Sequence, residues 1–466
     1  MSNDFEIKFN ESVFCTELTS GEKHSGNFLF GDEGITTTVI SFDGHFFVKP
    51  DAPIILMTEK LAVISLYDSF SAPPGVRSRY VEPPRTAHIQ KIVSNTAIVG
   101  NDEWTAEDRL KRVSFGVRNS MRLLRNHDKV ARLSMNRVRS EDEEDDWLLL
   151  NFRANGMVVR LSYTAQYDMW GNEPKEIEPR FELEFDEAVQ LGEHLEPMRQ
   201  VVSFCSMALG LPLTPSEIRI SRQSLFEFLD DVENHRPTGD HRVLYRWSEF
   251  DIDPSETSIF GSPVNAHKQD DLNDLGESLR VWLERGVQWG DAYTLMMGAL
   301  VRRNEFGADR LLNACKWFES LPNAEPKQVL DKETVKKISD AAIEAAIALG
   351  INDIEHRIAG SLRSVGQENR DILFRRLIGL AWHGYTIPHP LDDMVSDLKA
   401  SQNLRGKAAH GNLSIDDDAG AKNIMRYTDA LEALCLMLTV KDLPVTDEGR
   451  KRIHRHRLVE SYHLST

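Results

Sequence analysis

The chain has 466 residues, of which 41% are hydrophobic and 27% are charged, and its formal net charge is −18. This composition is typical of a folded globular protein rather than a disordered one, and the length predicts two or three domains. So large an acidic excess argues against a protein that coats DNA or an anionic membrane by bulk charge. A local nucleic-acid site is still compatible with it.

Cysteine usage and hydropathy indicate the cellular compartment. Cys15, Cys205, Cys315 and Cys435 are far apart and form no CxxC pair. Reduced thiols are therefore expected rather than a disulfide scaffold or a zinc ribbon. The first ten residues lack the apolar core of a signal peptide, and no apolar run reaches the ~18 residues that span a bilayer. We expect a cytoplasmic protein without a membrane partner.

Residues 1–230 have the pattern of a β-rich, sandwich-like region. β-Branched and aromatic runs occupy 35–42, 61–67, 147–152, 157–163 and 180–185. The last run alternates cleanly, with Phe181, Leu183 and Phe185 on one face, and Asn155-Gly156 predicts a hairpin turn. One amphipathic segment interrupts at 109–125. A helix is predicted over 187–209, ended by Gly210.

Residues 231–268 are rich in Asp, Pro, Ser and His and are predicted to be a connector. The run of acidic residues at 141–146 is expected to be a solvated loop beside a strand edge. A metal site is the alternative there, but the run lacks the spacing of a calcium loop.

From residue 269 to 466 the apolar period is helical. Helices are predicted at 272–285, 291–304, 308–321, 333–349, 391–409 and 420–440. Residues 354–383 fit one long helix or two, with Gly366 as the break. Trp282, Trp289 and Trp317 fall on the apolar faces and are expected in the core. The predicted fold class is α+β, with an all-α bundle after the β-rich region.

Charge is distributed unequally between these parts. Residues 331–466 hold 19 Lys or Arg and 20 Asp or Glu, which leaves 36 and 53 in the first 330 residues. The C-terminal part is thus nearly neutral. It contains a basic run at 450–457, expected to be an exposed tail or, alternatively, an arm that attracts phosphate. His454, His456 and His463 lack the Cys or carboxylate neighbours of a metal site, and His383 and His389 are expected to be structural.

Residues 403–412, NLRGKAAHGN, carry the most informative group of side chains. Arg405, Lys407 and His410 lie close together in the chain. Cleavage of RNA without a metal needs a base, an acid and a cation on the phosphate. Histidine suits the proton transfers because its pKa is near neutrality, and arginine offers a permanently charged planar fork.

Helix geometry limits how Arg405 and His410 can cooperate. At 100° per residue, five positions place them about 140° apart around a regular helix. Gly411 predicts that the helix ends at His410, since glycine suits a left-handed residue after the last turn. A two-fold dimer would bring two Arg–His pairs to one cleft.

The segment resembles the Arg-x4-6-His signature of HEPN domains, helical bundles that dimerise to form a ribonuclease site. Arg405 and His410 match with four intervening residues, between a long helix and a final amphipathic helix. The family often has Asn, Asp or His after the arginine, where this chain has Gly406. The resemblance implies a bundle with its core at about 333–443.

The upstream half resembles the N-terminal region of ApeA-type anti-phage proteins, which join a β-rich region to a C-terminal HEPN domain. The likeness is carried by the strand at 181–185, the helix starting at Leu195-Glu-Pro-Met-Arg-Gln200, and the stretch 209–218. Length and domain order also agree with that family.

These resemblances imply an abortive-infection effector in antiviral defence, namely an endoribonuclease with no metal or other cofactor. Its substrate would be RNA, with tRNA as one candidate, and its product a 2′,3′-cyclic phosphate. Arg405 and His410 would be catalytic, and Lys407 and Asn412 are candidate RNA contacts by proximity. The N-terminal region would sense a phage protein or restrain the nuclease, and the protein would be a homodimer or higher oligomer.

Two other functions are compatible with the sequence. A HEPN-like module could bind RNA or nucleotides without cutting them, as Gly406 and the acidic charge suggest. A dimerising adaptor would do neither.

Overall fold

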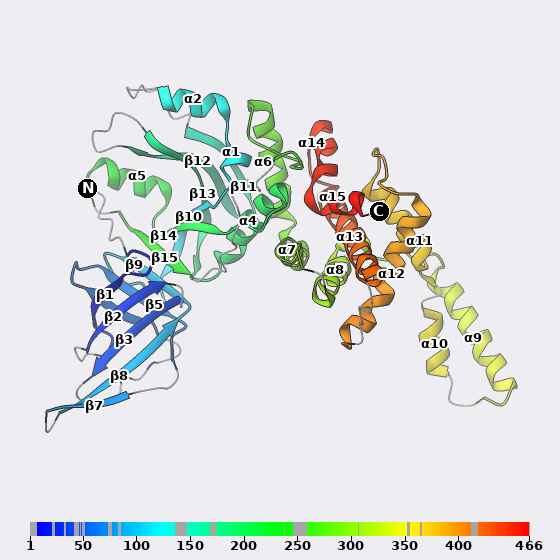
Figure 1. Cartoon of the computed structure of the whole chain (residues 1–466), viewed down its shortest axis with the longest axis horizontal. Coiled ribbons are helices and arrows are strands. Elements are labelled where there is room, and N and C mark those ends of the chain that lie inside the picture. The colour runs from blue at the N-terminus through cyan, green and yellow to red at the C-terminus, as the bar shows by residue number, and fades with distance from the viewer. Residues whose placement is uncertain are drawn as a thin grey trace. The chain divides into compact units, whose positions relative to one another are not determined.

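The computed structural model describes most of the chain: residues 7–20, 24–31, 34–41, 46, 48, 52–72, 77–82, 85–135, 147–167, 174–236, 238–245, 259–305, 307–351, 355–363, 366–411 and 418–465. Two compact units are formed, one by Met1–Val202 with Leu213–Asp251 and the other by Ser203–Pro212 with Ile252–Thr466. The first is built mainly of antiparallel strands and the second of helices (Figure 1), so the α+β class is confirmed. The acidic run at 141–146 and Asn412 lie outside the described residues.

The strands of the first unit are β1 (Ser12–Glu17), β2 (His24–Gly31), β3 (Gly34–Ser41), β4 (Ile54–Thr58), β5 (Val63–Tyr67), β6 (Phe70–Ser71), β7 (Arg77–Glu82), β8 (Arg85–Ser94), β9 (Thr96–Gly100), β10 (Arg109–Val117), β11 (Leu148–Ala154), β12 (Met157–Tyr167), β13 (Pro174–Gln190), β14 (Pro215–Ser221) and β15 (Asp240–Tyr245). They hydrogen-bond in the order β11-β12-β13-β10-β14-β15-β9-β5-β4-β1-β2-β3-β8-β6, and β7 pairs with β8. The pairs within the described strands are antiparallel throughout.

The predicted hairpin between β11 and β12 is confirmed. Asn155 and Gly156 both have positive φ, 47° and 72°, as a two-residue turn between twisted strands requires. The predicted alternation on β13 is also confirmed, since Phe181, Leu183 and Phe185 are buried. Register follows from this pattern, because a slip by one residue would expose the whole apolar face.

The predicted connector at 231–268 contains a strand that sequence composition does not reveal. Asp240, the first residue of β15, accepts a hydrogen bond from the buried Arg112 of β10 at 2.6 Å, and Arg112 also pairs with Glu182 of β13 at 3.0 Å. β15 belongs to the β-rich unit because it pairs with β14 and β9, and Asp240 neutralises a buried guanidinium there.

Two element predictions in this unit need correction. Residues 109–117 form a central strand, β10, rather than an interruption of the β pattern, because Leu110, Val113 and Phe115 are buried between β13 and β14. Helix α4 (Leu195–Leu209) begins later than predicted, because β13 continues to Gln190 and pairs there with β10. Its predicted end is confirmed, since Gly210 has φ 66°.

The remaining helices of the first unit are α1 (Met121–Leu124), α2 (His127–Met135) and α5 (Leu225–Glu233). The helical unit contains α6 (Gln269–Glu284), α7 (Gly286–Val301), α8 (Ala308–Ser320), η3 (Pro322–Ala324), α9 (Lys332–Ala348), α10 (Glu355–Arg363), α11 (Arg370–Ala381), α12 (Leu391–Ala409), α13 (Asp418–Val440), α14 (Asp447–Arg452), η5 (Ile453–Arg455) and α15 (Arg457–Leu464). Residues 354–383 therefore form two helices and not one. Trp282, Trp289 and Trp317 are buried as predicted.

The basic run at 450–457 is folded into α14, η5 and the start of α15, so it is not a tail, although Arg450, Lys451 and Arg455 are exposed. His456 is 1% exposed; its Nε2–H donates to the Met207 carbonyl at 2.8 Å. The Leu458 N–H donates to its Nδ1 at 3.3 Å, and burial lowers the pKa of His456 to about 4. A Cβ on Gly261 would overlap the backbone of Arg455 and His456. The buried side chains of Ile453 and His456, interleaved with exposed charges, anchor this run to the core.

The four cysteines are free and buried, in agreement with the prediction of unpaired thiols. None of the helices in the described ranges is both long and apolar enough to cross a bilayer.

Candidate functional site

Helix α12 carries the Arg-x4-His segment and has the bounds that the sequence predicts. It begins after Pro390, and Asp392 and Asp393 in its first turn match the positive end of the helix dipole. Its inward face contains Met394, Val395, Asp397, Leu398, Ser401 and Ala408. Arg405 and Lys407 lie near the end of the helix, after most of these buried positions, and are exposed.

The predicted end of α12 is confirmed. His410 is the C-cap residue, with φ −98° and ψ 9°, and Gly411 follows with φ 67°. The His410 N–H donates to the Gly406 carbonyl at 3.3 Å, and the Gly411 N–H donates to Ala408 at 3.2 Å. The His410 N–H thus keeps the i→i−4 hydrogen bond of an α-helix, and the helix ends between His410 and Gly411.

Arg405 lies on the side of α12 that faces α8. Its Nη1 forms an ion pair with Glu319 near the end of α8, and the two side chains are 44% and 40% exposed. Because both charges are in contact with solvent, the pair contributes little stability. An anionic ligand can therefore displace Glu319 from the guanidinium at small cost.

His410 and Lys407 are also exposed. No hydrogen bond or ion pair joins either side chain to another residue of the described ranges. Asn412, the other candidate RNA contact, is outside those ranges. The structure thus places Arg405, Lys407 and His410 at one helix end, accessible to a large substrate.

Gly406, the departure from the HEPN pattern, occupies open space. A Cβ at this position would meet no atom of the described residues within 4 Å. Packing does not require a glycine here. The helical backbone does not require one either, since Gly406 lies inside α12 and glycine has a poor helix propensity.

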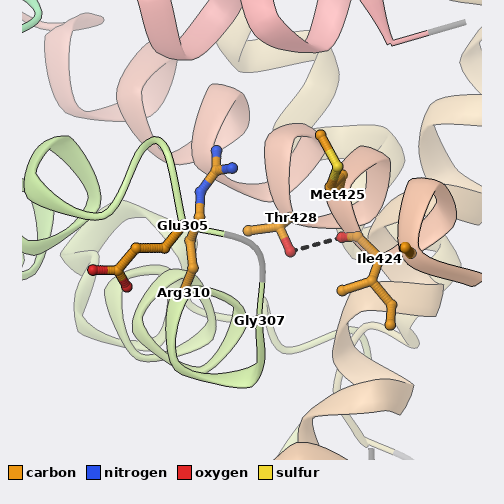
Figure 2. A pocket seen from close by; sticks show the side chains of 7 residues that line it. Glu305, Gly307, Arg310, Ile424, Met425 and Thr428 are labelled. Atoms are coloured by element: carbon orange, nitrogen blue, oxygen red, sulfur yellow. Dashed lines mark hydrogen bonds between the residues drawn. The ribbon is translucent and has the colours of Figure 1, made fainter. Parts of the chain in front are cut away.

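A buried ion-pair cluster lies in the same bundle and was not anticipated from the sequence. Arg310 of α8 donates from Nη2 to Asp429 at 2.6 Å and to Glu432 at 2.6 Å, and from Nε to Glu432 at 3.2 Å. Figure 2 shows Arg310 beside a small pocket between the start of α8 and α13, lined by Ile424, Met425 and Thr428. That pocket has a volume of about 20 Å³, room for one water molecule and not for a substrate.

Burial and ion pairing act in opposite directions on the pKa values of this cluster. Burial raises the pKa of Glu432 to about 7, although Arg310 acts in the opposite direction. Burial lowers the pKa of Arg310, but Glu432 and Asp429 outweigh this and raise it overall. The sequence signal was a single glutamate within the apolar run 430–438, a position where an unpaired charge would be costly. The cluster joins α8 to α13 and is structural.

Three other histidines of the helical unit have contacts of their own. His389 Nε2 is 2.8 Å from the Tyr462 carbonyl, which supports its predicted structural role. The rings of His454 and His463 are 5.6 Å apart. Within the described ranges no three His, Cys, Asp or Glu side chains are grouped as metal ligands.

In comparisons with protein-family models, curated proteins and solved structures, nothing matches this chain.

Proposed function

We propose that the chain is a metal-independent endoribonuclease that acts in abortive infection. The observation that carries this proposal is the exposure of Arg405 and His410 at the C-terminal end of α12, where Glu319 is the only ion-pair partner of Arg405 in the described residues. The resemblance of residues 403–412 to the HEPN signature supports the same assignment, with a HEPN-like bundle at about 333–443.

The proposed reaction is an internal transfer on the RNA backbone. The 2′-oxygen attacks the adjacent phosphorus while a base removes its proton; the P–O2′ bond forms and the P–O5′ bond breaks. An acid gives a proton to the 5′-oxygen, so the products are a 2′,3′-cyclic phosphate and a 5′-hydroxyl. His410 is suited to the proton transfers, and Arg405 to the charge that develops on the phosphate.

One protomer offers a single histidine in this segment, whereas the reaction has two proton transfers. A two-fold homodimer supplies a second Arg405–His410 pair. The exposed position of both side chains at a helix end is compatible with such a shared cleft. Lys407 and Asn412 would add contacts to the RNA, for which tRNA is one candidate.

In this proposal the β-rich region is a sandwich-like domain. It would sense a phage protein or restrain the nuclease. Its charge supports a restraint, because an acidic surface repels RNA. Replacing the acidic run 141–146 by neutral residues tests this: basal RNA cleavage is expected to rise, and an unchanged rate would contradict the restraint.

A second candidate is an RNA- or nucleotide-binding module that does not cut. Gly406 favours it, since this residue supplies no polar contact beside Arg405. An adaptor that only dimerises is the third.

Incubation of the purified full chain with total RNA separates these candidates. We expect cleavage by the wild type, loss of cleavage in His410→Ala and Arg405→Ala, and no effect of EDTA. His356→Ala and Arg357→Ala are the matched controls, because both residues are exposed on α10 and lie outside the motif. RNA binding without cleavage would support the module, neither activity would support the adaptor, and inhibition by EDTA would overturn the metal-free mechanism.

A further inference from the structure

A second pocket in the helical unit lies away from Arg405 and His410. It has a volume of about 120 Å³ and is formed where the ends of α11 and α13 meet α14. Its floor is apolar, made by the buried side chains of Ala381, Met437, Val440 and Ile453. This is six times the volume of the pocket beside Arg310, so it can hold several heavy atoms of a ligand rather than one water molecule.

The rim of this pocket is cationic. Lys441, at the end of α13, and Arg450, on α14, line it together with His383 and Tyr385 from the segment after α11. Lys441, Arg450 and His383 are exposed, whereas Tyr385 is half-buried. Among the described residues, no carboxylate lines the pocket.

Two acidic residues lie near the rim and weaken its field without cancelling it. Asp442 Oδ1 is 3.7 Å from Lys441 Nζ, at the outer limit of an ion pair. Asp447 is near Tyr385, as is Arg450. The guanidinium of Arg450 makes no ion pair with any residue in the described part of the chain, so its donors remain available to a ligand.

The pocket is at the end of α13 remote from the Arg-x4-His segment. Arg370 and Arg375 of α11 donate to Asn403 and Asp392 of α12, so α11 and α12 run antiparallel and the end of α11 lies toward the start of α12. Ala381, at that end of α11, lines the pocket. Met437 to Lys441 are at the end of the 23-residue helix α13. A ligand here would not occupy the proposed nuclease site.

We propose that this pocket binds a small amphiphilic anion, with its apolar body on the floor formed by Ala381, Met437, Val440 and Ile453 and its acidic group between Lys441 and Arg450. An apolar cavity with a few convergent polar groups is the usual form of a small-molecule site. The floor selects for an apolar body of a few carbons, and the two cations select for a carboxylate over a neutral head group.

The test uses the full chain with 13C-labelled methionine methyl groups and hexanoate as the probe. Titration is expected to shift the Met437 signal, assigned with Met437→Leu, and to leave the signal of Met394 on α12 unchanged. Hexan-1-ol, which lacks the charge, is expected to bind about tenfold more weakly, as is inorganic phosphate, which lacks the apolar body.

Two variants locate the binding. The double variant Lys441→Gln with Arg450→Gln is expected to bind hexanoate no better than hexan-1-ol, and Val445→Phe, at the half-buried mouth, to block both. Lys451→Gln with Arg455→Gln is the matched control, because these exposed cations are in the same basic run and do not line the pocket. Equal binding of hexanoate and hexan-1-ol by the wild type, binding of phosphate as tight as that of hexanoate, or unchanged binding in the first double variant would each overturn the proposal.

Discussion

Arg310 donates to both carboxylate oxygens of Glu432, which lies 122 positions later in the chain, and both side chains are buried. Asp429 accepts a further hydrogen bond from the same guanidinium. The pairing fixes α8 against α13, and α8 in turn presents Glu319 to Arg405. A purely structural ion cluster thus supports the helix that holds the counter-ion of the proposed catalytic arginine.

Replacing Arg310 with alanine is expected to lower the free energy of unfolding by about 3–5 kcal/mol, because Asp429 and Glu432 would remain buried without a cation. Urea unfolding followed by far-ultraviolet circular dichroism measures this loss. Arg280→Ala is the control, since Arg280 pairs with Glu277 and Glu284 on an exposed helix face. Equal losses in both variants would show that the cluster adds nothing beyond surface pairing.

Glu432 also predicts a pH dependence of stability. Burial raises its pKa to about 7 in the folded protein, against about 4.3 in an unfolded chain. Between these values the folded state binds more protons than the unfolded state, so stability falls as the pH rises from about 4.3 through 7. Glu432→Gln cannot titrate at this position. The difference in unfolding free energy between wild type and variant should therefore decrease as the pH rises over this range. A difference independent of pH between 5 and 8 would contradict the raised pKa.

Glu319→Gln is expected to increase RNA cleavage severalfold, because it releases Arg405 to bind phosphate. Stability should change by less than about 1 kcal/mol, since the ion pair is exposed. Initial cleavage rates at low and moderate salt measure the effect, which should be larger at low salt. Glu333→Gln, which breaks an exposed pair with Lys337 on α9, is the matched control. If both variants behave alike, Glu319 does not compete with RNA for Arg405.

Gly406→Asn tests whether the departure from the HEPN pattern limits activity. Asparagine fits the open space at Gly406 and has a better helix propensity than glycine, so α12 should be stabilised by a few tenths of a kcal/mol. RNA cleavage is expected to increase if a polar side chain beside Arg405 assists it. Gly360→Asn on α10 is the control, because that glycine also has open space around it. An activity of Gly406→Asn equal to that of wild type would mean that the polar neighbour is dispensable here.

Local chemistry explains which elements were predictable. The bounds of α12 follow from Pro390 and Gly411, and the β11–β12 hairpin follows from Asn155-Gly156, because these residues restrict the backbone wherever they occur. The strand β15 was not predicted because its place depends on pairing with β14 and with β9, which is far away in the chain, and not on its own composition.

At the candidate site, too, features set by local sequence were predictable and features set by the packing of distant helices were not. The position of His410 at a helix end could be predicted from Gly411. The ion pair between Arg405 and Glu319 could not, because it depends on how α8 packs against α12. The two cations of the second pocket, Lys441 and Arg450, meet for the same reason, since each is an ordinary surface residue in the sequence.

The hydrogen bond from His456 to Met207 spans 249 positions. During synthesis the end of α4 is made long before the segment that covers it, and at roughly 5–20 residues per second the ribosome needs about 12 to 50 s to add the residues between them. This contact of the helical unit therefore cannot form until residue 456 has been made. A nascent chain that stalls earlier leaves the buried end of α4 without the segment that covers it.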